Sequence, residues 1–282
     1  MNAMKLSVPL FVALAFGPFH AWAAPILGTE LSSFAILGAS TVTNVPTSAV
    51  AGNVGVWSSG GANAITGFNS SPGLTKSDPQ VTGGLVHAGT ATAQLAQGQL
   101  TNAITNLGLM GAGTTLADPD LSGSTLKPGV YTVHAGTSNL TGILTLDGLG
   151  NANAAWVFQM DSSLITSTGS AIHVINTGSD AGVFWDVRSS ATLGSDTSFQ
   201  GNILAHTSIT LDTGATIGCG SALANTGGVT MSMDGIGTGC GGGITVPTGG
   251  GTPTFLPFVS VSAVPEPEAY AMFMAGLGLM AG

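Results

Sequence analysis

The side chains that could do catalytic chemistry are scattered in this sequence. Glycoside hydrolysis needs two carboxylates at a defined separation, whereas the aspartates stand singly near expected turns, where they bond the local backbone. Three histidines have no evident partner, and nucleophile-elbow, zinc-protease and phosphate-loop motifs are absent from the sequence. We therefore expect no enzyme, no cofactor and no metal site. The residues concerned are Asp147, Asp186, Asp196, Asp212, Asp234, His134, His173 and His206.

Threonine instead recurs in a short pattern, in which it stands between two apolar residues. The pattern occurs as Ala191-Thr192-Leu193, Ile209-Thr210-Leu211 and Val229-Thr230-Met231. Its period is about one supersecondary unit, as in a solenoid. Neighbouring side chains of a strand point to opposite faces, so we expect the apolar residues inside and Thr192, Thr210 and Thr230 outside, one above another. Leu144-Thr145-Leu146 has the same form, and its Thr145 could add a fourth rung.

A second register places small hydroxylated residues just before an inward Ile or Phe. Residues 168–172 can be laid over residues 213–217, and residues 195–199 fall at the corresponding place between them. Stacked strands lie about 4.8 Å apart and alternate residues of a strand about 6.7 Å apart, so such rows would form a flat, regular surface. Stacked threonine has a structural explanation too, because branched side chains suit strands.

The remaining sequence predicts short strands and one helix. Charged residues make up 6% of the chain, against roughly 25% in a typical globular protein, and 44 of 282 residues are glycine, which favours short strands with tight turns. Between residues 89 and 109, apolar residues recur at helical spacing. Thr90 can cap this helix and Gly108 can end it. Its narrow stripe predicts that the helix covers one outer face of the solenoid. The stripe is Leu95, Leu100, Ala103, Ile104 and Leu107.

The charge balance excludes two classes of partner. The net charge is -9, and only Lys76, Lys127 and Arg188 are cationic after the first 23 residues. Nucleic-acid binding needs a basic footprint, and attraction to anionic lipid needs basic clusters, so we expect neither.

Residues 1–23 read as a secretory signal peptide. Lys5 supplies a positive start, residues 6–16 form an apolar core, and Ala21-Trp22-Ala23 is a small-x-small site, so cleavage is expected after Ala23. The apolar run is too short for the alternative of a membrane anchor. In an oxidising compartment Cys219 and Cys240 favour a disulfide over two free thiols, worth roughly 3 kcal/mol in the loop-entropy account.

Several longer runs are similar to those of the ice-binding protein family with a DUF3494-type domain. They occur in the expected order between about Ile26 and Thr245. Among them are Phe34-Ala-Ile-Leu37, Pro128-Gly-Val-Tyr131, Trp156-Val-Phe-Gln159, Gly201-Asn-Ile-Leu-Ala205 and Thr213-Gly-Ala-Thr216. The resemblance implies a mainly β fold over residues 26–246: a discontinuous, right-handed parallel β-helix of triangular section with one long α-helix alongside.

The resemblance also implies a face rich in Thr, Ser and Ala that adsorbs to an ice crystal surface and inhibits ice growth or recrystallisation. Residues 213–216 fit the Thr-Ala/Gly-x-Thr/Asn motif of some members, whereas Asp196 departs from it. The expected ice-contacting residues are Thr145, Thr168, Thr192, Ser195, Ser198, Thr210, Thr213, Thr216 and Thr230. The alternative is a non-enzymatic cell-surface or biofilm-matrix protein, in which the same solenoid presents a surface to exopolysaccharide.

The C-terminal residues divide into a linker and a sorting segment. Residues 247–262 are rich in Gly, Pro and Thr and predict a flexible linker. Residues 263–282 resemble a PEP-CTERM signal, in which the sorting motif Val264, Pro265, Glu266 and Pro267 precedes an apolar segment. The basic cluster of such signals is missing, so we expect a truncated or defective signal. The resemblance implies handling by an exosortase, membrane contact only through this segment, and export to the envelope, outer surface or matrix of a Gram-negative bacterium.

Overall fold

The computed structural model describes residues 23–58, 64–247, 251–257 and 259–261. The expected leader, apart from Ala23, lies outside these residues, and so does the whole of the expected sorting segment, residues 263–282.

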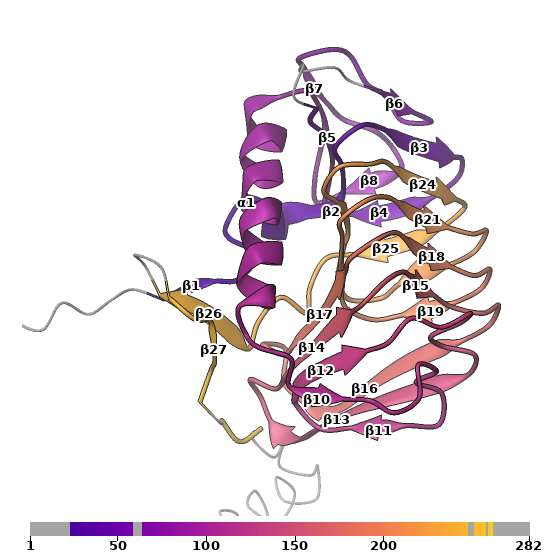
Figure 1. The fold of residues 1–282 in the computed structure, drawn as a ribbon. Coiled ribbons are helices and arrows are strands. Elements are labelled where there is room, and N and C mark those ends of the chain that lie inside the picture. The colour runs from indigo at the N-terminus through magenta and orange to yellow at the C-terminus, as the bar shows by residue number, and fades with distance from the viewer. Residues whose placement is uncertain (1–22, 59–63, 248–250, 258, 262–282) are drawn as a thin grey trace, which may run out of the picture.

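Three sheets of mostly parallel strands form the sides of a solenoid (Figure 1). The ten-stranded sheet has the order β10 (Thr114–Thr115), β12 (Gly129–Val133), β14 (Ala155–Met160), β17 (Gly182–Val187), β20 (Asn202–Ala205), β23 (Ala222–Ala224), β2 (Phe34–Gly38), β5 (Asn53–Val56), β9 (Val86–Ala88) and antiparallel β7 (Thr75–Lys76). The six-stranded sheet has the order β15 (Leu164–Ile165), β18 (Ala191–Leu193), β21 (Ile209–Leu211), β24 (Val229–Ser232), β3 (Val42–Val45) and β6 (Ile65–Thr66). The eight-stranded sheet has the order β11 (Thr125–Leu126), β13 (Ile143–Asn151), β16 (Ala171–Thr177), β19 (Ser198–Phe199), β22 (Thr216–Ile217), β25 (Gly235–Gly237), β4 (Ala49–Ala51) and β8 (Val81–Thr82).

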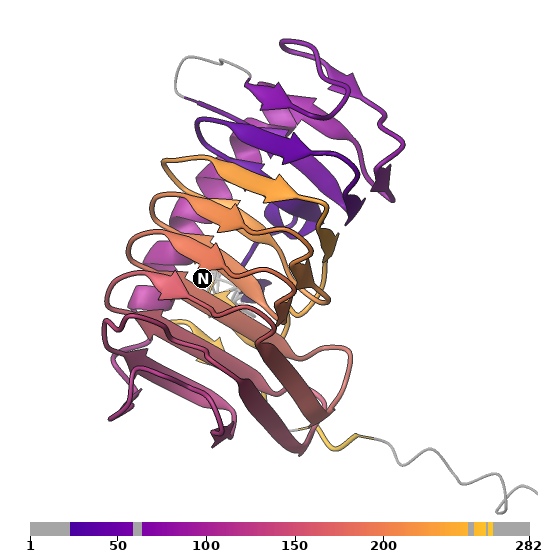
Figure 2. The ribbon, with the colours of Figure 1, turned by 90° about the vertical axis from the view of Figure 1, so that its right-hand side faces the viewer.

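The coils do not stack in chain order. In all three sheets a strand from the C-terminal half pairs with one from the N-terminal end: β23 with β2, β24 with β3 and β25 with β4. Figure 2 shows the N-terminal coils, in indigo and purple, above the orange coils of the C-terminal half. The helix returns the chain to the far end of the stack, from which the later coils climb back. This order, with one α-helix among the described residues, confirms the predicted discontinuous β-helix.

The interior is filled by side chains that alternate with outward residues along each strand. Apolar residues of the three sheets form one buried cluster. Phe158 and Trp185 stack within it, with ring centroids 4.0 Å apart. The indole N–H groups of Trp156 and Trp185 donate to Leu126 O and Gln200 O, at 3.1 Å each. Large rings can therefore be buried here without leaving a donor unpaired.

Helix α1 (Ala91–Gly108) lies on the outer side of the ten-stranded sheet. Thr90 caps it as predicted, because its side-chain oxygen accepts from Ala93 N at 3.3 Å. The helix buries a stripe that packs against residues such as Phe34 and Leu223 in a second apolar cluster. The stripe is Ala93, Ala96, Leu100, Ala103, Ile104 and Leu107.

The prediction for Leu95 is wrong. Its side chain is 59% exposed. Five residues separate it from Leu100, which turns it about 140° away from the buried stripe at 3.6 residues per turn.

A short antiparallel sheet closes the C-terminal side. Its order is β1 (Ala23–Pro25), β26 (Ile244–Pro247) and β27 (Thr254–Phe255). Beyond β27, Val259 N donates to the Asn151 side chain at 2.9 Å and Val261 N to Gly150 O at 2.9 Å. The described parts of the predicted 247–262 linker are thus hydrogen-bonded to the solenoid, because their backbone groups find partners on β26 and at the end of β13.

Cys219 and Cys240 form a disulfide, the pair that the sequence favours. Their Cα atoms are 5.5 Å apart. Cys219 lies two residues after β22, and Cys240 lies three residues after β25. The bond therefore joins successive coils just beyond the ends of two interior strands of the eight-stranded sheet.

Candidate functional site

The six-stranded sheet carries a single column of threonines on its outer side. Thr192 of β18 pairs with Thr210 of β21, and Thr210 with Thr230 of β24. The column continues into the N-terminal coils, because Thr230 pairs with Thr43 of β3 and Thr43 with Thr66 of β6. We call these five residues the threonine ladder.

Strand alternation explains why all five threonines face outward. The residue before each one is apolar, points into the solenoid and is at most 7% exposed. These inner neighbours are Ala191, Ile209, Val229, Val42 and Ile65. A strand cannot turn one of these residues inward without turning its neighbour outward, so burial of the core fixes the ladder in place.

The ladder hydroxyls have no hydrogen-bond partner among the residues that the structure describes. Each side chain is half-buried or exposed. Water is thus the natural partner of each hydroxyl. Stacked strands place successive hydroxyls about 4.8 Å apart, so the ladder offers hydroxyls to water at a regular spacing.

Two further rows flank the ladder on the same face. One row consists of small residues just before the strands. Their backbone carbonyls accept hydrogen bonds from the strand of the neighbouring coil, as from Ala191 N to Ser208 O and from Ile209 N to Gly228 O, both 2.9 Å. In the other row Asp212 is the one ionisable residue. The rows are Ser190, Ser208, Gly228 and Thr41, and Gly194, Asp212, Ser232 and Val45. The face is therefore low in bulk and nearly free of charge.

The second register predicted from the sequence lies at the next corner and on the eight-stranded sheet. Ala171 pairs with Ser198, and Ser198 with Thr216, as the alignment requires. At the corner, Gly169 N donates to Ser195 O at 2.9 Å and Asp196 N to Thr213 O at 3.2 Å. Thr168, Ser195 and Thr213 therefore stand in successive coils. Nine expected residues are thereby divided between two faces and the corner that joins them.

Several hydroxyl groups outside the ladder make hydrogen bonds within the protein. Thr216 Oγ1 donates to Thr197 O at 3.3 Å, and Thr213 Oγ1 to Ser232 Oγ at 3.2 Å. Inside the corner, Thr166 Oγ1 and Thr197 Oγ1 are buried and 3.0 Å apart. These bonds hold the corner, and they leave less hydroxyl capacity for an outside partner.

The expectation that Thr145 adds a rung to the ladder is wrong. Thr145 belongs to β13 of the eight-stranded sheet, where it pairs with Thr125 and His173. The corresponding ladder position beside Thr192 is held by Ile165. An apolar–Thr–apolar pattern specifies an outward threonine but says nothing about which sheet receives the strand.

The sequence reasoning missed Thr43 and Thr66. Their signal is the apolar–Thr pair of the other rungs, Val42-Thr43 and Ile65-Thr66. Thr43 stacks on Thr230, which lies more than 120 residues later in the chain, and Thr66 stacks on Thr43 in turn. A search for a fixed period cannot find a rung that joins the column from the other end of the chain.

The corner also contains a buried carboxyl. Asp234 is 2% exposed; its Oδ2 accepts from Ser232 N at 2.6 Å, and its Oδ1 has no partner. Burial raises the pKa of this carboxyl to about 7, and the N–H groups of Ser232, Ala215 and Gly214 only partly offset the effect. Asp234 N also donates to Ser48 Oγ across 186 residues of sequence. This residue therefore links the last C-terminal coil to the N-terminal coil that stacks on it.

Two features first read from sequence gain a structural explanation. Asp196, the charge that breaks the family motif, has φ of 57° at an exposed turn, a conformation that Asp tolerates. His134 and His206 are not without partners: His134 Nδ1 lies 2.8 Å from Asp161 Oδ2, and His206 Nε2 lies 3.5 Å from Asp186 Oδ1. Burial raises the pKa of the Asp186 carboxyl.

No cluster of three or more metal-ligating side chains occurs within the described ranges. In the same ranges, α1 lacks the apolar character that a membrane crossing requires.

Comparison with known proteins gives one consistent family. The model of the Ice-binding-like family matches residues 36–237. An ice-binding protein from Nostoc sp. (strain HG1) is 40% identical over 242 residues, which cover 82% of this chain and 82% of that protein. Ice-binding protein K3-B1 from Typhula ishikariensis is 33% identical over 195 residues, or 65% of this chain and 78% of that protein.

Solved structures agree. The crystal structure of an ice-binding protein from the Antarctic ascomycete Antarctomyces psychrotrophicus matches with a TM-score of 0.65 and 31% identity, over 77% of this chain and 98% of that one. A glycosylated ice-binding protein from an Arctic yeast matches with a TM-score of 0.67 and 27% identity, over 85% of this chain and 98% of that one. The fold is thus shared with ice-binding proteins of known structure.

Proposed function

The chain belongs to the Ice-binding-like family, and from this premise we propose that it adsorbs to ice through the threonine ladder and so inhibits ice growth or recrystallisation. The observation that carries the proposal is the column of five outward threonines whose hydroxyls have no partner among the described residues.

The mechanism is physical. Each rung offers one hydroxyl, which can hydrogen-bond a water molecule, and one methyl group. The methyl group makes no hydrogen bond and so does not disturb the order of the water next to it. Backbone hydrogen bonds between the strands fix the spacing before ice is met, so adsorption costs little conformational entropy. Many weak contacts then add up over the face. An adsorbed molecule pins the crystal surface locally, and no bond is made or broken.

The ladder face suits this role better than the eight-stranded face. Its middle row repeats one residue type over five rungs, whereas the corresponding outer row of the eight-stranded sheet changes at almost every rung. That row is Ile143, Ala171, Ser198, Thr216, Gly235 and Ala49. We assign the main contact to the ladder, and an accessory contact to the corner residues Thr168, Ser195 and Thr213.

Substitution of Thr210, the rung between Thr192 and Thr230, tests the proposal. A tyrosine there would stand above the face and lift the ice lattice off the neighbouring rungs. Thr145→Tyr is the matched control, because it adds the same ring on the other sheet. We expect recrystallisation inhibition and thermal hysteresis to fall in Thr210→Tyr and to persist in Thr145→Tyr. Equal activity of wild type and Thr210→Tyr, with both folded, would refute the assignment.

We propose that the protein works without catalysis, after export. A leader of residues 1–23 and an exosortase-type signal around Val264, Pro265, Glu266 and Pro267 support this from the sequence, with exopolysaccharide at the surface or matrix of a Gram-negative cell as a second partner. Cell fractionation together with the N-terminal sequence of the mature protein tests the proposal, and a cytoplasmic protein that retains residues 1–23 would contradict it.

A further inference from the structure

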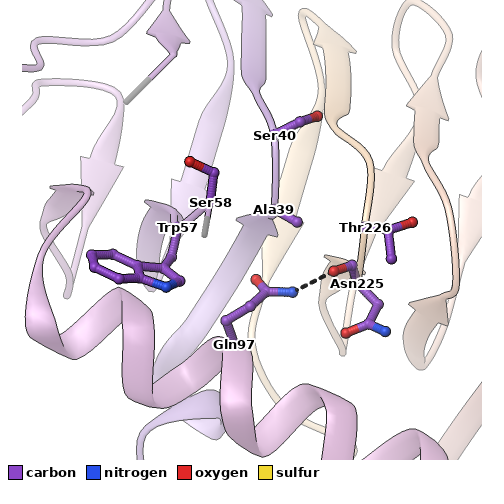
Figure 3. Close-up of a pocket in the computed structure, with 7 residues that line it drawn as sticks. All are labelled: Ala39, Ser40, Trp57, Ser58, Gln97, Asn225 and Thr226. Carbon is purple, nitrogen blue, oxygen red and sulfur yellow. Dashed lines mark hydrogen bonds between the residues drawn. The ribbon is translucent and has the colours of Figure 1, made fainter. Parts of the chain in front are cut away.

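A pocket of about 420 Å³ lies between α1 and the corner where the ten-stranded sheet meets the six-stranded sheet. Figure 3 shows its walls: Trp57 on one side, Thr226 and Asn225 on the other, and Gln97 reaching in from the helix. The volume falls within the range of small-molecule sites, roughly 300–1,000 Å³. The lining residues are Ala39, Ser40, Trp57, Ser58, Gln97, Asn225 and Thr226.

Gln97 presents an unpaired acceptor at this pocket. The residue is 9% exposed, and its Nε2 donates to Ala224 O at 3.2 Å and to Asn225 O at 2.9 Å. Both amide hydrogens are thereby used, which fixes the orientation of the amide. Its Oε1 is buried without a partner and is turned away from Asn225, toward the Trp57 side (Figure 3). A buried acceptor left unpaired costs about 1–3 kcal/mol, so a donor that reaches it is favoured.

Trp57 supplies the other half of the site. Trp156 and Trp185 are fully buried and bond a carbonyl through their N–H groups. Trp57 is half-buried, and its N–H has no partner among the described residues. The pocket therefore combines an aromatic face with a free ring donor. Such amphipathic surfaces suit ligands with one apolar and one polar side.

The rest of the lining is polar but uncharged. Asn225 Oδ1 accepts from Thr101 Oγ1 at 2.9 Å, which holds the Asn225 side chain toward the helix. Thr226 Oγ1 donates to His206 O and can still accept. No ionisable side chain lines the pocket. An ionic ligand would lose its hydration here without gaining a counter-charge.

We propose that this pocket is a binding site for a neutral saccharide unit. The apolar C–H face of a sugar ring would stack on Trp57, and its hydroxyls would pair with Gln97 Oε1 and Thr226 Oγ1. The site stands beside the start of β3 and β24, at the rim of the threonine ladder. A bound glycan would thus hold the protein at its side while leaving the ladder exposed. The inference does not depend on ice binding.

Titration of the purified protein with cellohexaose and maltohexaose tests the site, with an oligomannuronate as the acidic probe. Calorimetry gives the affinity, and tryptophan fluorescence reports on Trp57. We expect millimolar to sub-millimolar binding of at least one neutral probe, an at least tenfold weaker binding in Trp57→Ala, and an intermediate loss in Trp57→Phe, which keeps a ring but no N–H. Gln94→Ala, on the exposed side of α1, is the control and should bind as wild type.

Three results would overturn the site: no binding of either neutral probe, unchanged binding in Trp57→Ala, or tighter binding of the acidic probe. Thr210→Tyr separates the two proposals. It should lose ice activity but keep saccharide binding, whereas Trp57→Ala should do the reverse. Retained ice activity in Trp57→Ala also shows that the variant is folded.

Discussion

The six-stranded and eight-stranded sheets are built by the same coils but present different surfaces. The first repeats threonine over five rungs, and those hydroxyls have no partner in the described residues. The second is longer, yet its outer row mixes apolar, small and hydroxylated residues, and the hydroxyl of Thr216 is bonded to the protein. Exposure alone does not separate the faces, since Thr216 and Thr230 are both exposed.

The difference shows what a regular surface requires. A hydroxyl that closes a corner stabilises the solenoid and cannot also order water outside it. The protein places its corner-holding hydroxyls, such as Thr166 and Thr197, beside the turn from one sheet to the next. The ladder threonines lie within short strands, and their hydroxyls make no such corner-holding bond among the described residues. Function on this fold depends on which hydroxyls the architecture leaves unused.

The largest expected effect comes from a matched pair of exposed threonines. Thr230→Tyr puts a ring into the ladder, and Thr216→Tyr puts one on the eight-stranded sheet in the preceding coil. We expect the concentration needed for recrystallisation inhibition to rise at least about tenfold in Thr230→Tyr, which corresponds to about 1.4 kcal/mol, and little in Thr216→Tyr. The reverse ranking would move the ice contact to the eight-stranded sheet.

Loss of the disulfide should affect stability and not the face. Cys219→Ser with Cys240→Ser removes a cross-link with a sequence separation of 21 residues beyond the ends of β22 and β25, worth roughly 3 kcal/mol. Thermal unfolding should shift down by about 6–12 °C, using 2–4 °C per kcal/mol for a chain of this size. Ice activity measured well below the transition should stay the same. A loss of activity at that temperature would mean that the ladder depends on the disulfide.

The corner between the faces should make stability depend on pH. The pKa of Asp234 is raised from 3.8 to about 7 by burial, so the folded state holds a proton that the unfolded state has released. Its stabilising contribution is full below pH 3.8 and is lost as the pH rises through about 7. Asp234→Asn should remove that loss and raise the melting temperature at pH 8 by several degrees, with little change at pH 4. If the melting temperature changed between pH 4 and pH 8 by the same amount in Asp234→Asn as in the wild type, the pH dependence would come from another group.

The smallest expected effect concerns the one charge in the rows beside the ladder. Asp212 is exposed and holds its own hydration water, which competes with an ordered layer. Asp212→Asn keeps the shape of the side chain, and we expect ice activity to improve by less than about twofold. Dose–response curves of recrystallisation inhibition, recorded beside Asp180→Asn as a control on an exposed turn, can resolve this change. A clear loss would show that the carboxylate takes part in contact.

Local sequence was enough to predict each element that depends on neighbouring residues. The tripeptides around Thr192, Thr210 and Thr230 give their inward and outward sides, and Thr90 gives the start of the helix. The stacking of residues 168–172 beneath residues 195–199 followed from their shared pattern. In each case the period of the chain and the need to bury apolar residues leave one arrangement.

The predictions that failed concern features that depend on contacts between residues distant in sequence. Thr145 has the right neighbours but lies in the wrong sheet, because the corners before it decide where its strand pairs. Thr43 joins the ladder only because β24 pairs with β3. The described residues after β26 looked like a linker because Gly and Pro dominate their composition, yet Val259 and Val261 bond to the solenoid. No local pattern records such pairings.

The pairing of β23, β24 and β25 with β2, β3 and β4 sets the order in which the molecule can be completed. A chain that emerges from its N-terminus makes the upper coils first, but their lower strand edges stay open until the final coils arrive. Open edges invite pairing with other chains. The last strands to be made therefore complete the middle of the stack and not its ends. A chain that ends before β23 would leave two half-stacks, each with an unpaired strand edge.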